Sequence, residues 1–141
     1  MIDNALSFIL DELNAFLSAR FADGGPHAVL SGLANQDGSV PRGIENKLVL
    51  SLVNIERETA LNLNIYLRVA ANFGGNYIES LQFLSAALEF FQEQPVFSAP
   101  VMERVNVQML NLTIQDLHSL WSISGSKYLP SAFYKVRMVT T

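Results

Sequence analysis

Residues 113–141, TIQDLHSLWSISGSKYLPSAFYKVRMVTT, place a capped helix, a turn and a strand in one continuous run. Thr113 followed three residues later by Asp116 is a helix N-cap pattern, with an acid where Glu or Gln is more usual. Ser-Gly-Ser at 124–126 ends the predicted helix, because glycine accepts the left-handed backbone found there. The apolar residues between them recur at helical spacing and predict one buried face: Ile114, Leu117, Leu120 and Trp121.

Residues 133–139 are rich in β-branched and aromatic side chains and predict a strand. Successive side chains of a strand point to opposite faces. One face therefore carries Tyr134, Val136 and Met138 and should be buried. The other carries Phe133, Lys135, Arg137 and Val139 and should be mixed. Nothing in this stretch has the composition of a catalytic centre.

Two long helices are predicted upstream. Residues 2–21 carry apolar side chains at i, i+3 and i+4 and polar ones opposite, which is the pattern of an amphipathic helix. Asn76 and Glu79 form a second cap pattern, opening a helix through residue 94 that Pro95 ends. The expected buried stripe of this second helix is Tyr77, Ile78, Leu81, Leu84, Leu88 and Phe91.

The remaining segments predict strands and loops. Residues 47–55 form a nearly unbroken apolar run, typical of a central strand covered on both faces. Residues 62–69 alternate cleanly and should pair with that strand. Residues 27–33 could form a short strand, residues 34–44 a loop and residues 70–75 a break. A loop is expected at 98–103, and the later strand changes phase, which suggests a bulge near Met109.

These elements predict one domain spanning residues 1–141, of the α/β (α+β) class. We expect a mixed, mainly antiparallel sheet of about four or five strands, packed by two long helices and one short helix. The strands at 47–55 and 62–69 are joined too tightly for a crossover helix, which favours antiparallel pairing.

Composition narrows the functional classes. The chain is 50% hydrophobic and 16% charged, against a typical charged fraction of ~25%, which favours buried subunit contacts. Its net charge is -4 and its nine Lys and Arg are dispersed, so we expect no nucleic-acid partner. Cysteine is absent, which excludes disulfides and thiol chemistry. No basic leader and no apolar run of ~18 residues is present, so we expect a cytoplasmically made chain without membrane insertion.

The sequence offers little for catalysis. The two histidines, His27 and His118, have no second ligand at metal-binding spacing. The chain has no Gly-x-Ser-x-Gly elbow, and residues 73–76 (FGGN) lack both phosphate-loop patterns although they precede a predicted helix. We therefore expect no enzyme and no cofactor. A small-molecule pocket near residues 73–76 is the alternative.

Three segments carry a family resemblance: MIDNALSFILDELNAFL at the start, NIYLRVAANFGGNYIESLQFLSAALEFFQEQPVF in the middle and LHSLWSISGSKYLPSAFYKVRMV at the end. The chain resembles the N-terminal domain of the cap, or tail terminator, proteins of extracellular contractile injection systems of the antifeeding-prophage and virulence-cassette type. The middle and final segments are the specific ones. The family usually has a longer, proline-containing segment between the two paired strands, where this chain has only residues 56–61.

The resemblance implies a phage tail-terminator-like fold and a structural role. Such subunits form a ring, hexameric in related tails, on the baseplate-distal end of the inner tube. There they stop tube growth and contact the last sheath layer, in a particle made in the bacterial cytoplasm and sometimes released. A tail-completion protein or baseplate adaptor of the same particle is the alternative. No catalytic residues come with the resemblance.

Exposed strand edges can pair with a neighbouring subunit by β-augmentation. We expect the C-terminal strand to supply that contact, with Lys135 and Arg137 facing acidic neighbours and Trp121 as either core or anchor. The candidate subunit interface comprises Trp121, Tyr134, Lys135, Arg137 and Met138.

Overall fold

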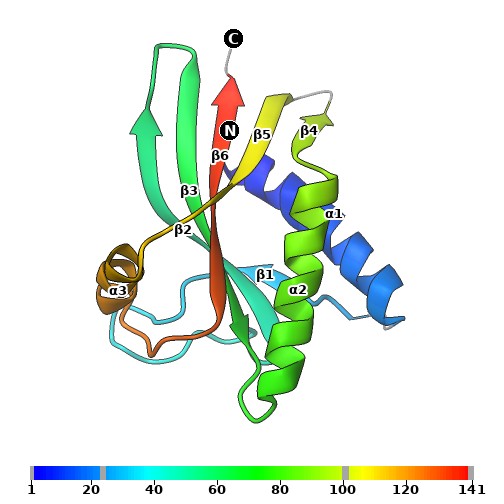
Figure 1. Cartoon of the computed structure of the whole chain (residues 1–141), viewed down its shortest axis with the longest axis vertical. Coiled ribbons are helices and arrows are strands. Elements are labelled where there is room, and N and C mark those ends of the chain that lie inside the picture. The colour runs from blue at the N-terminus through cyan, green and yellow to red at the C-terminus, as the bar shows by residue number, and fades with distance from the viewer. Residues whose placement is uncertain (1, 23–24, 100–101, 140–141) are drawn as a thin grey trace.

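The computed structural model describes residues 2–22, 25–99 and 102–139 and shows one α+β domain (Figure 1). The elements in chain order are α1 (Ile2–Phe21), β1 (Ala28–Leu30), β2 (Lys47–Arg57), β3 (Asn62–Asn72), α2 (Tyr77–Glu93), β4 (Val96–Ala99), β5 (Met102–Leu110), α3 (Ile114–Ser122) and β6 (Ser131–Val139).

The strands of the described residues form one six-stranded sheet in the order β1-β2-β3-β6-β5-β4. β1 pairs with β2 in parallel, and the other four pairings are antiparallel. This arrangement confirms the predicted α+β class and the mainly antiparallel sheet. The sheet has one strand more than expected, because part of the loop predicted at 98–103 belongs to β4 and β5. β4 has only four residues, too few to show a periodic pattern in the sequence.

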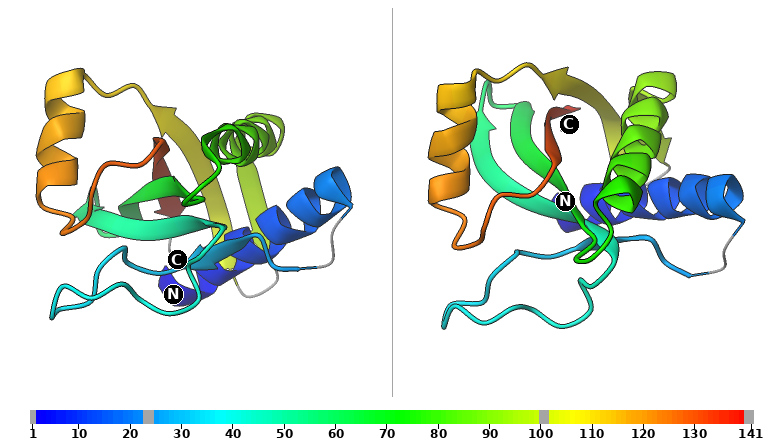
Figure 2. Two further views of the ribbon diagram at one scale, coloured as in Figure 1. Left: turned by 90° about the horizontal axis from the view of Figure 1, so that it is seen from below. Right: turned by 60° about the horizontal axis from the view of Figure 1, so that its bottom comes forward.

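The two faces of the sheet carry different layers (Figure 2). α1 and α2 cover one face and enclose the larger core, in which Ile9, Leu13 and Phe90 are buried. α3 and the loop between β1 and β2 cover part of the opposite face. They enclose a smaller core of Leu33, Ile44, Val49, Ala70, Trp121 and Phe133.

α1 has the predicted bounds and also fixes the edge strand β1. The side chain of Asn14 accepts hydrogen bonds from the backbone N–H groups of His27 (2.9 Å) and Ala28 (2.8 Å), and its amide donates to the Ala28 carbonyl (3.0 Å). One side chain thus supplies the hydrogen bonds that a neighbouring strand would otherwise supply to this segment.

α2 begins as predicted, because the Asn76 side chain accepts a hydrogen bond from the Glu79 backbone N–H at 3.0 Å. The predicted buried stripe is wrong in its first half, where Tyr77 and Ile78 are each 65% exposed and Leu81 is 40% exposed. Because α2 is apolar around most of its circumference, periodicity alone does not single out the packed face. The buried residues are Ser80, Phe83, Ala86, Ala87, Phe90 and Phe91.

The C-terminal stretch forms the predicted helix, turn and strand. The Thr113 hydroxyl accepts a hydrogen bond from the Asp116 backbone N–H at 3.1 Å, and Gly125 adopts a left-handed φ of 74° after the helix. Ile114 was expected in the buried face but is 86% exposed. The expected bulge near Met109 is also absent, because β5 pairs with β6 in unbroken register to Leu110 and then ends.

β2 and β3 form the long hairpin at the upper left of Figure 1, and the strands differ from prediction in three respects. β3 continues to Asn72 instead of breaking at residue 70. β2 lies second from the sheet edge, and its burial extends only over residues 48–51. A register shift occurs between Leu52 and Asn54. The end of the hairpin extends beyond the helices, which leaves residues 54–57 exposed.

Candidate functional site

The predicted interface strand, β6, lies inside the sheet. β3 pairs with it from Ser131 to Val139, and β5 pairs with it from Phe133 to Met138. Both edges of β6 are therefore hydrogen-bonded within the domain, and the expectation that this strand adds to a neighbouring subunit by β-augmentation is wrong. A strand needs an unpaired edge to accept another strand.

Two of the five predicted interface residues belong to the larger core. Tyr134 and Met138 are buried against the α1 and α2 layer, and Tyr134 packs on Phe91 with ring centroids 4.5 Å apart. Burial raises the pKa of Tyr134 to about 12, because the charged phenolate would lose its hydration there. These side chains stabilise the domain and are not available on its surface.

Trp121 lies in the smaller core and is 6% exposed. Its indole N–H donates a hydrogen bond to the Ser131 hydroxyl at 3.2 Å, and its ring meets Tyr128 edge-on at 5.3 Å. The guanidinium carbon of Arg68 lies 4.5 Å from the centroid of the indole ring. The structure thus places Trp121 in the core, one of the two roles that the sequence left open.

Lys135 and Arg137 remain at the surface, on the face of the sheet opposite Tyr134. Arg137 forms an ion pair with Glu58, in the turn between β2 and β3, with Nε and Oε2 3.2 Å apart. Both side chains of this pair are about two-fifths exposed, at 41% and 42%. Such exposed pairs contribute at most about 1 kcal/mol to stability. Lys135 comes two residues before Arg137 in β6 and lies on the same face of the strand.

A polar network surrounds this ion pair, and the sequence did not identify it. Glu56 accepts hydrogen bonds from the Tyr66 hydroxyl at 3.2 Å and from the Asn64 amide at 3.3 Å. Burial raises the pKa of the Tyr66 phenol, and the hydrogen bond to the Glu56 carboxylate raises it further. Glu56 and Asn64 are cross-strand partners, as are Asn64 and Arg137, and this pairing brings the network together.

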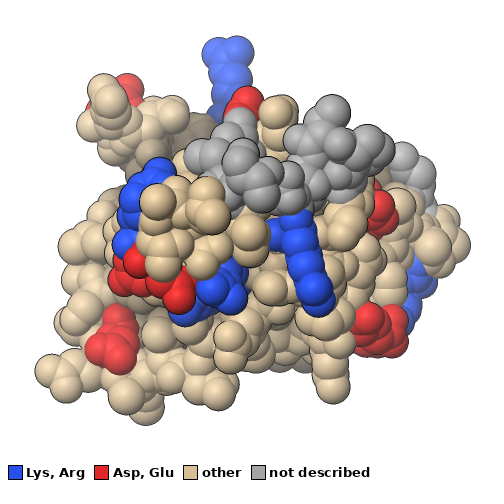
Figure 3. Space-filling view, turned by 90° about the horizontal axis from the view of Figure 1, so that it is seen from above, with Lys and Arg blue, Asp and Glu red and all other residues tan. Residues whose placement is uncertain are grey.

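Figure 3 looks onto the end of the molecule that carries the hairpin tip. Acidic and basic side chains are interleaved there, and neither sign forms a continuous patch on the visible face. Mixed charge of this kind favours contacts with a surface of complementary pattern and not general attraction to a polyanion.

The sheet does offer an unpaired edge, on the outer side of β2. β1 pairs only with Leu48–Leu50, and no other described strand lies on that side of residues 52–57, which we call the outer edge of β2. Leu52 and Ile55 on this segment are 45% and 46% exposed. An edge with exposed apolar side chains is where a second chain can add a strand.

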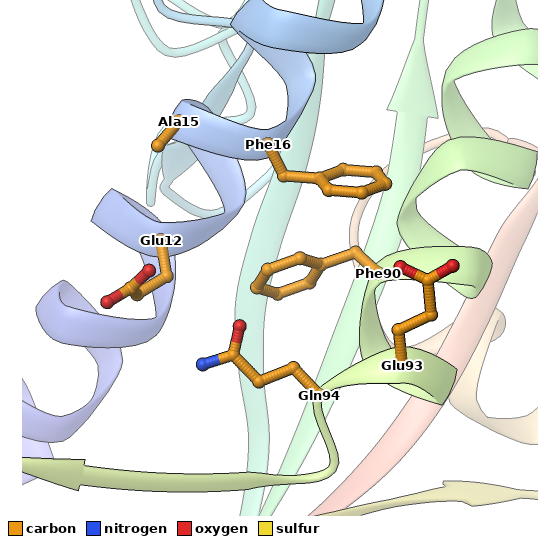
Figure 4. A pocket seen from close by; sticks show the side chains of 6 residues that line it. All are labelled: Glu12, Ala15, Phe16, Phe90, Glu93 and Gln94. Atoms are coloured by element: carbon orange, nitrogen blue, oxygen red, sulfur yellow. The ribbon is translucent and has the colours of Figure 1, made fainter.

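A groove lies between α1 and α2, with a volume of about 430 Å³ (Figure 4). The rings of Phe16 and Phe90 project into it from the two helices, with centroids 5.4 Å apart. Its remaining lining residues are Glu12, Ala15, Glu93 and Gln94. The groove is therefore apolar at its base with carboxylates at its rim.

The two histidines occupy different environments. His27 is buried beside Phe21 and Phe83, whereas His118 is exposed on α3. In the part of the chain that the structure describes, no group of three or more His, Cys, Asp or Glu side chains is placed to hold a metal ion. Over the same residues, no helix is both long and apolar enough to cross a membrane.

Comparison with known protein families agrees with the resemblance carried by the three quoted segments. The model of the family described as the Pvc16 N-terminal domain matches residues 6–141, which is nearly the whole chain. A search of curated proteins found no match. The chain therefore belongs to the Pvc16 N-terminal domain family, a membership that associates it with contractile injection systems of the virulence-cassette type.

Proposed function

We propose that this chain is a structural cap, or tail terminator, on the baseplate-distal end of the inner tube of a contractile injection particle. The match to the Pvc16 N-terminal domain family over residues 6–141 is the observation that carries this proposal. In this role the protein acts by shape and self-association and catalyses no reaction. It stops tube growth and contacts the terminal sheath layer.

The subunits assemble into a ring, a hexamer by analogy with related tails. The outer edge of β2 supports this proposal, because it combines unpaired backbone with the exposed side chains of Leu52 and Ile55. A strand from the next subunit would extend the sheet there. Arg137 on β6 forms an ion pair with Glu58 at the tip of the same hairpin, and the charges there would fix the register of that contact.

The inner tube protein and the sheath protein are the proposed partners. The particle is assembled in the bacterial cytoplasm and released from there. Neither nucleic acid nor membrane insertion enters this proposal, in keeping with a net charge of -4 and dispersed basic residues.

Native mass spectrometry of the chain, alone and with its tube protein, tests self-association. We expect a discrete ring-sized species, and a chain that stays monomeric at high concentration in both samples would refute the proposal. Electron microscopy of particles carrying a label on this chain then locates it. A label on the end distant from the baseplate supports the cap, whereas a label at the baseplate would identify an adaptor instead.

Substitution at the edge tests how the ring forms. Ile55→Lys should abolish the ring while leaving the fold intact, because a lysine on an edge strand opposes strand addition. Val40→Lys is the matched control, since Val40 is 66% exposed in the loop between β1 and β2. Lys135→Gln should weaken assembly more modestly. Rings of unchanged yield from Ile55→Lys would exclude the outer edge of β2 as the contact.

A further inference from the structure

Arg68 is a buried cation without an acidic partner among the residues that the structure describes. It lies in β3 opposite Ser51 of β2 and Phe133 of β6, and only 5% of its surface is exposed. Its Nη2 donates to the Ser51 hydroxyl at 3.3 Å, while its Nε–H is buried without a hydrogen-bond partner. Burial lowers the pKa of Arg68, and no described carboxylate forms an ion pair with it. Arginine is rarely buried in this way unless it is paired.

The surroundings hold the guanidinium in a defined orientation. Its carbon lies 4.5 Å from the centroid of the Trp121 ring, which covers one side of the group. Trp121 is itself fixed by its hydrogen bond to Ser131. The Ser51 hydroxyl donates to the Ser31 carbonyl and so presents its lone pairs to Arg68. Stacking and this hydrogen bond position the donors before any ligand arrives.

Arg68 lines a cavity of about 270 Å³ between α3, the β2–β3 hairpin and the loop after β1. Of the described residues that line this cavity, Arg68 alone is ionisable. Most of the walls are apolar or small, and Leu52 and Val53 connect them to the outer edge of β2. The full lining is Gly32, Leu33, Ala34, Ser51, Leu52, Val53, Arg68, Leu120, Ile123 and Ser124.

We propose that this cavity binds one carboxylate on a short apolar stem, the side chain of a glutamate or aspartate presented by a polypeptide that passes the outer edge of β2. The guanidinium supplies the charge and the planar donors that a carboxylate accepts, and the apolar walls hold the stem. A phosphate fits less well, because a dianion in an apolar cavity needs a second cation and the lining provides none. The site stands whether or not the chain caps a tube.

Isovalerate is a suitable probe because it joins a carboxylate to a branched apolar stem, and isovaleramide is its uncharged counterpart. The Nε–H signal of Arg68 in the NMR spectrum, assigned by its loss in Arg68→Lys, reports directly on the site. We expect a saturable shift of this signal with isovalerate and a response at least about tenfold weaker with isovaleramide. An equal response to both compounds, or none, would overturn the proposal.

Thermal unfolding gives a second readout. Isovalerate should raise the melting temperature of the unaltered chain and of Arg42→Met, since Arg42 is exposed, but not that of Arg68→Met. An equal rise in Arg68→Met would contradict the proposal.

Dilution without probe then identifies the natural source of the carboxylate. A concentration-dependent Arg68 signal indicates a second copy of this chain, and a constant signal that responds to tube or sheath protein indicates that partner.

Discussion

Trp121 and Arg68 should be energetically coupled, and a double-mutant cycle measures the coupling. Trp121→Ala removes a large side chain from the smaller core, which by itself costs about 3–5 kcal/mol. It also removes the aromatic surface on which the guanidinium of Arg68 rests, a contribution of about 0.5–2 kcal/mol for a desolvated cation–π contact. The first contribution is present whatever residue occupies position 68, and the second requires the arginine.

Arg68→Met replaces a buried, unpaired charge by an apolar side chain of similar length. We expect the single variant to be as stable as the original chain or more stable. Arg68 forms no ion pair with a described carboxylate, so the substitution leaves no buried charge unpaired. In the Arg68→Met background, Trp121→Ala should cost less than in the original chain, by about 1 kcal/mol.

Urea unfolding followed by far-ultraviolet circular dichroism is the appropriate assay, because Trp121 is the single tryptophan and its fluorescence would vanish with the mutation. A loss of about 4 kcal/mol lowers the midpoint by roughly 1.3–4 M for the usual urea dependence. Trp121→Phe keeps an aromatic ring and serves as a milder variant. Equal costs of Trp121→Ala in both backgrounds, within about 0.5 kcal/mol, would refute the stacking. A Trp121→Ala chain that unfolds normally but fails to assemble would place Trp121 at an interface.

Three further predictions concern the fold. Phe83→Ala should destabilise the domain by about 3–5 kcal/mol, because Phe83 is buried. Ile78→Ala on the same helix should change stability by less than about 0.5 kcal/mol, because Ile78 is exposed. Equal melting temperatures of the two variants would mean that α2 packs by its other face. Asn14→Ala removes three hydrogen bonds between this side chain and the backbone of residues 27 and 28, and should cost about 2–3 kcal/mol, with faster amide exchange at Ala28. Amide protection equal to that of the original chain would contradict this. Tyr134 should ionise near pH 12 in a titration of tyrosine absorbance, and Tyr134→Phe should remove that step. Because its pKa is raised above the ordinary value of about 10, its contribution to stability is complete below pH 10 and is lost as the pH rises through 12. A normal titration of all four tyrosines would refute the burial.

The candidate site could be predicted only in part. Lys135 and Arg137 were identified from the alternation of β6, and they do lie on the outward face. The network with Glu56 and Glu58 was missed, since it depends on the pairing of strands whose register the sequence does not display. Arg68 gave no signal either, because it occupies an ordinary polar position of an alternating strand. Its burial arises only when α3 packs across that face.

Local chemistry determined where the elements begin and end. The Thr113 and Asn76 caps were identified correctly, because a side chain that bonds a backbone group two or three residues away acts without tertiary help. The whole of α1 was identified from its amphipathic periodicity. The same stretch, 113–141, carried the most specific part of the family resemblance. Family membership was thus evident from the sequence, and the family match confirms it.

Tertiary structure decided which side of each element faces the core and which strand is an edge. α2 is apolar on too many sides for periodicity to choose its packed face, and the rings of α1 select Phe83 and Phe90. The sequence led us to expect that β6 would pair with a neighbouring subunit, yet β6 lies between β3 and β5. Among the described strands, none pairs with the outer edge of β2. The physical reason is that pairing and packing depend on residues far apart in the chain, whereas capping and alternation depend on neighbours.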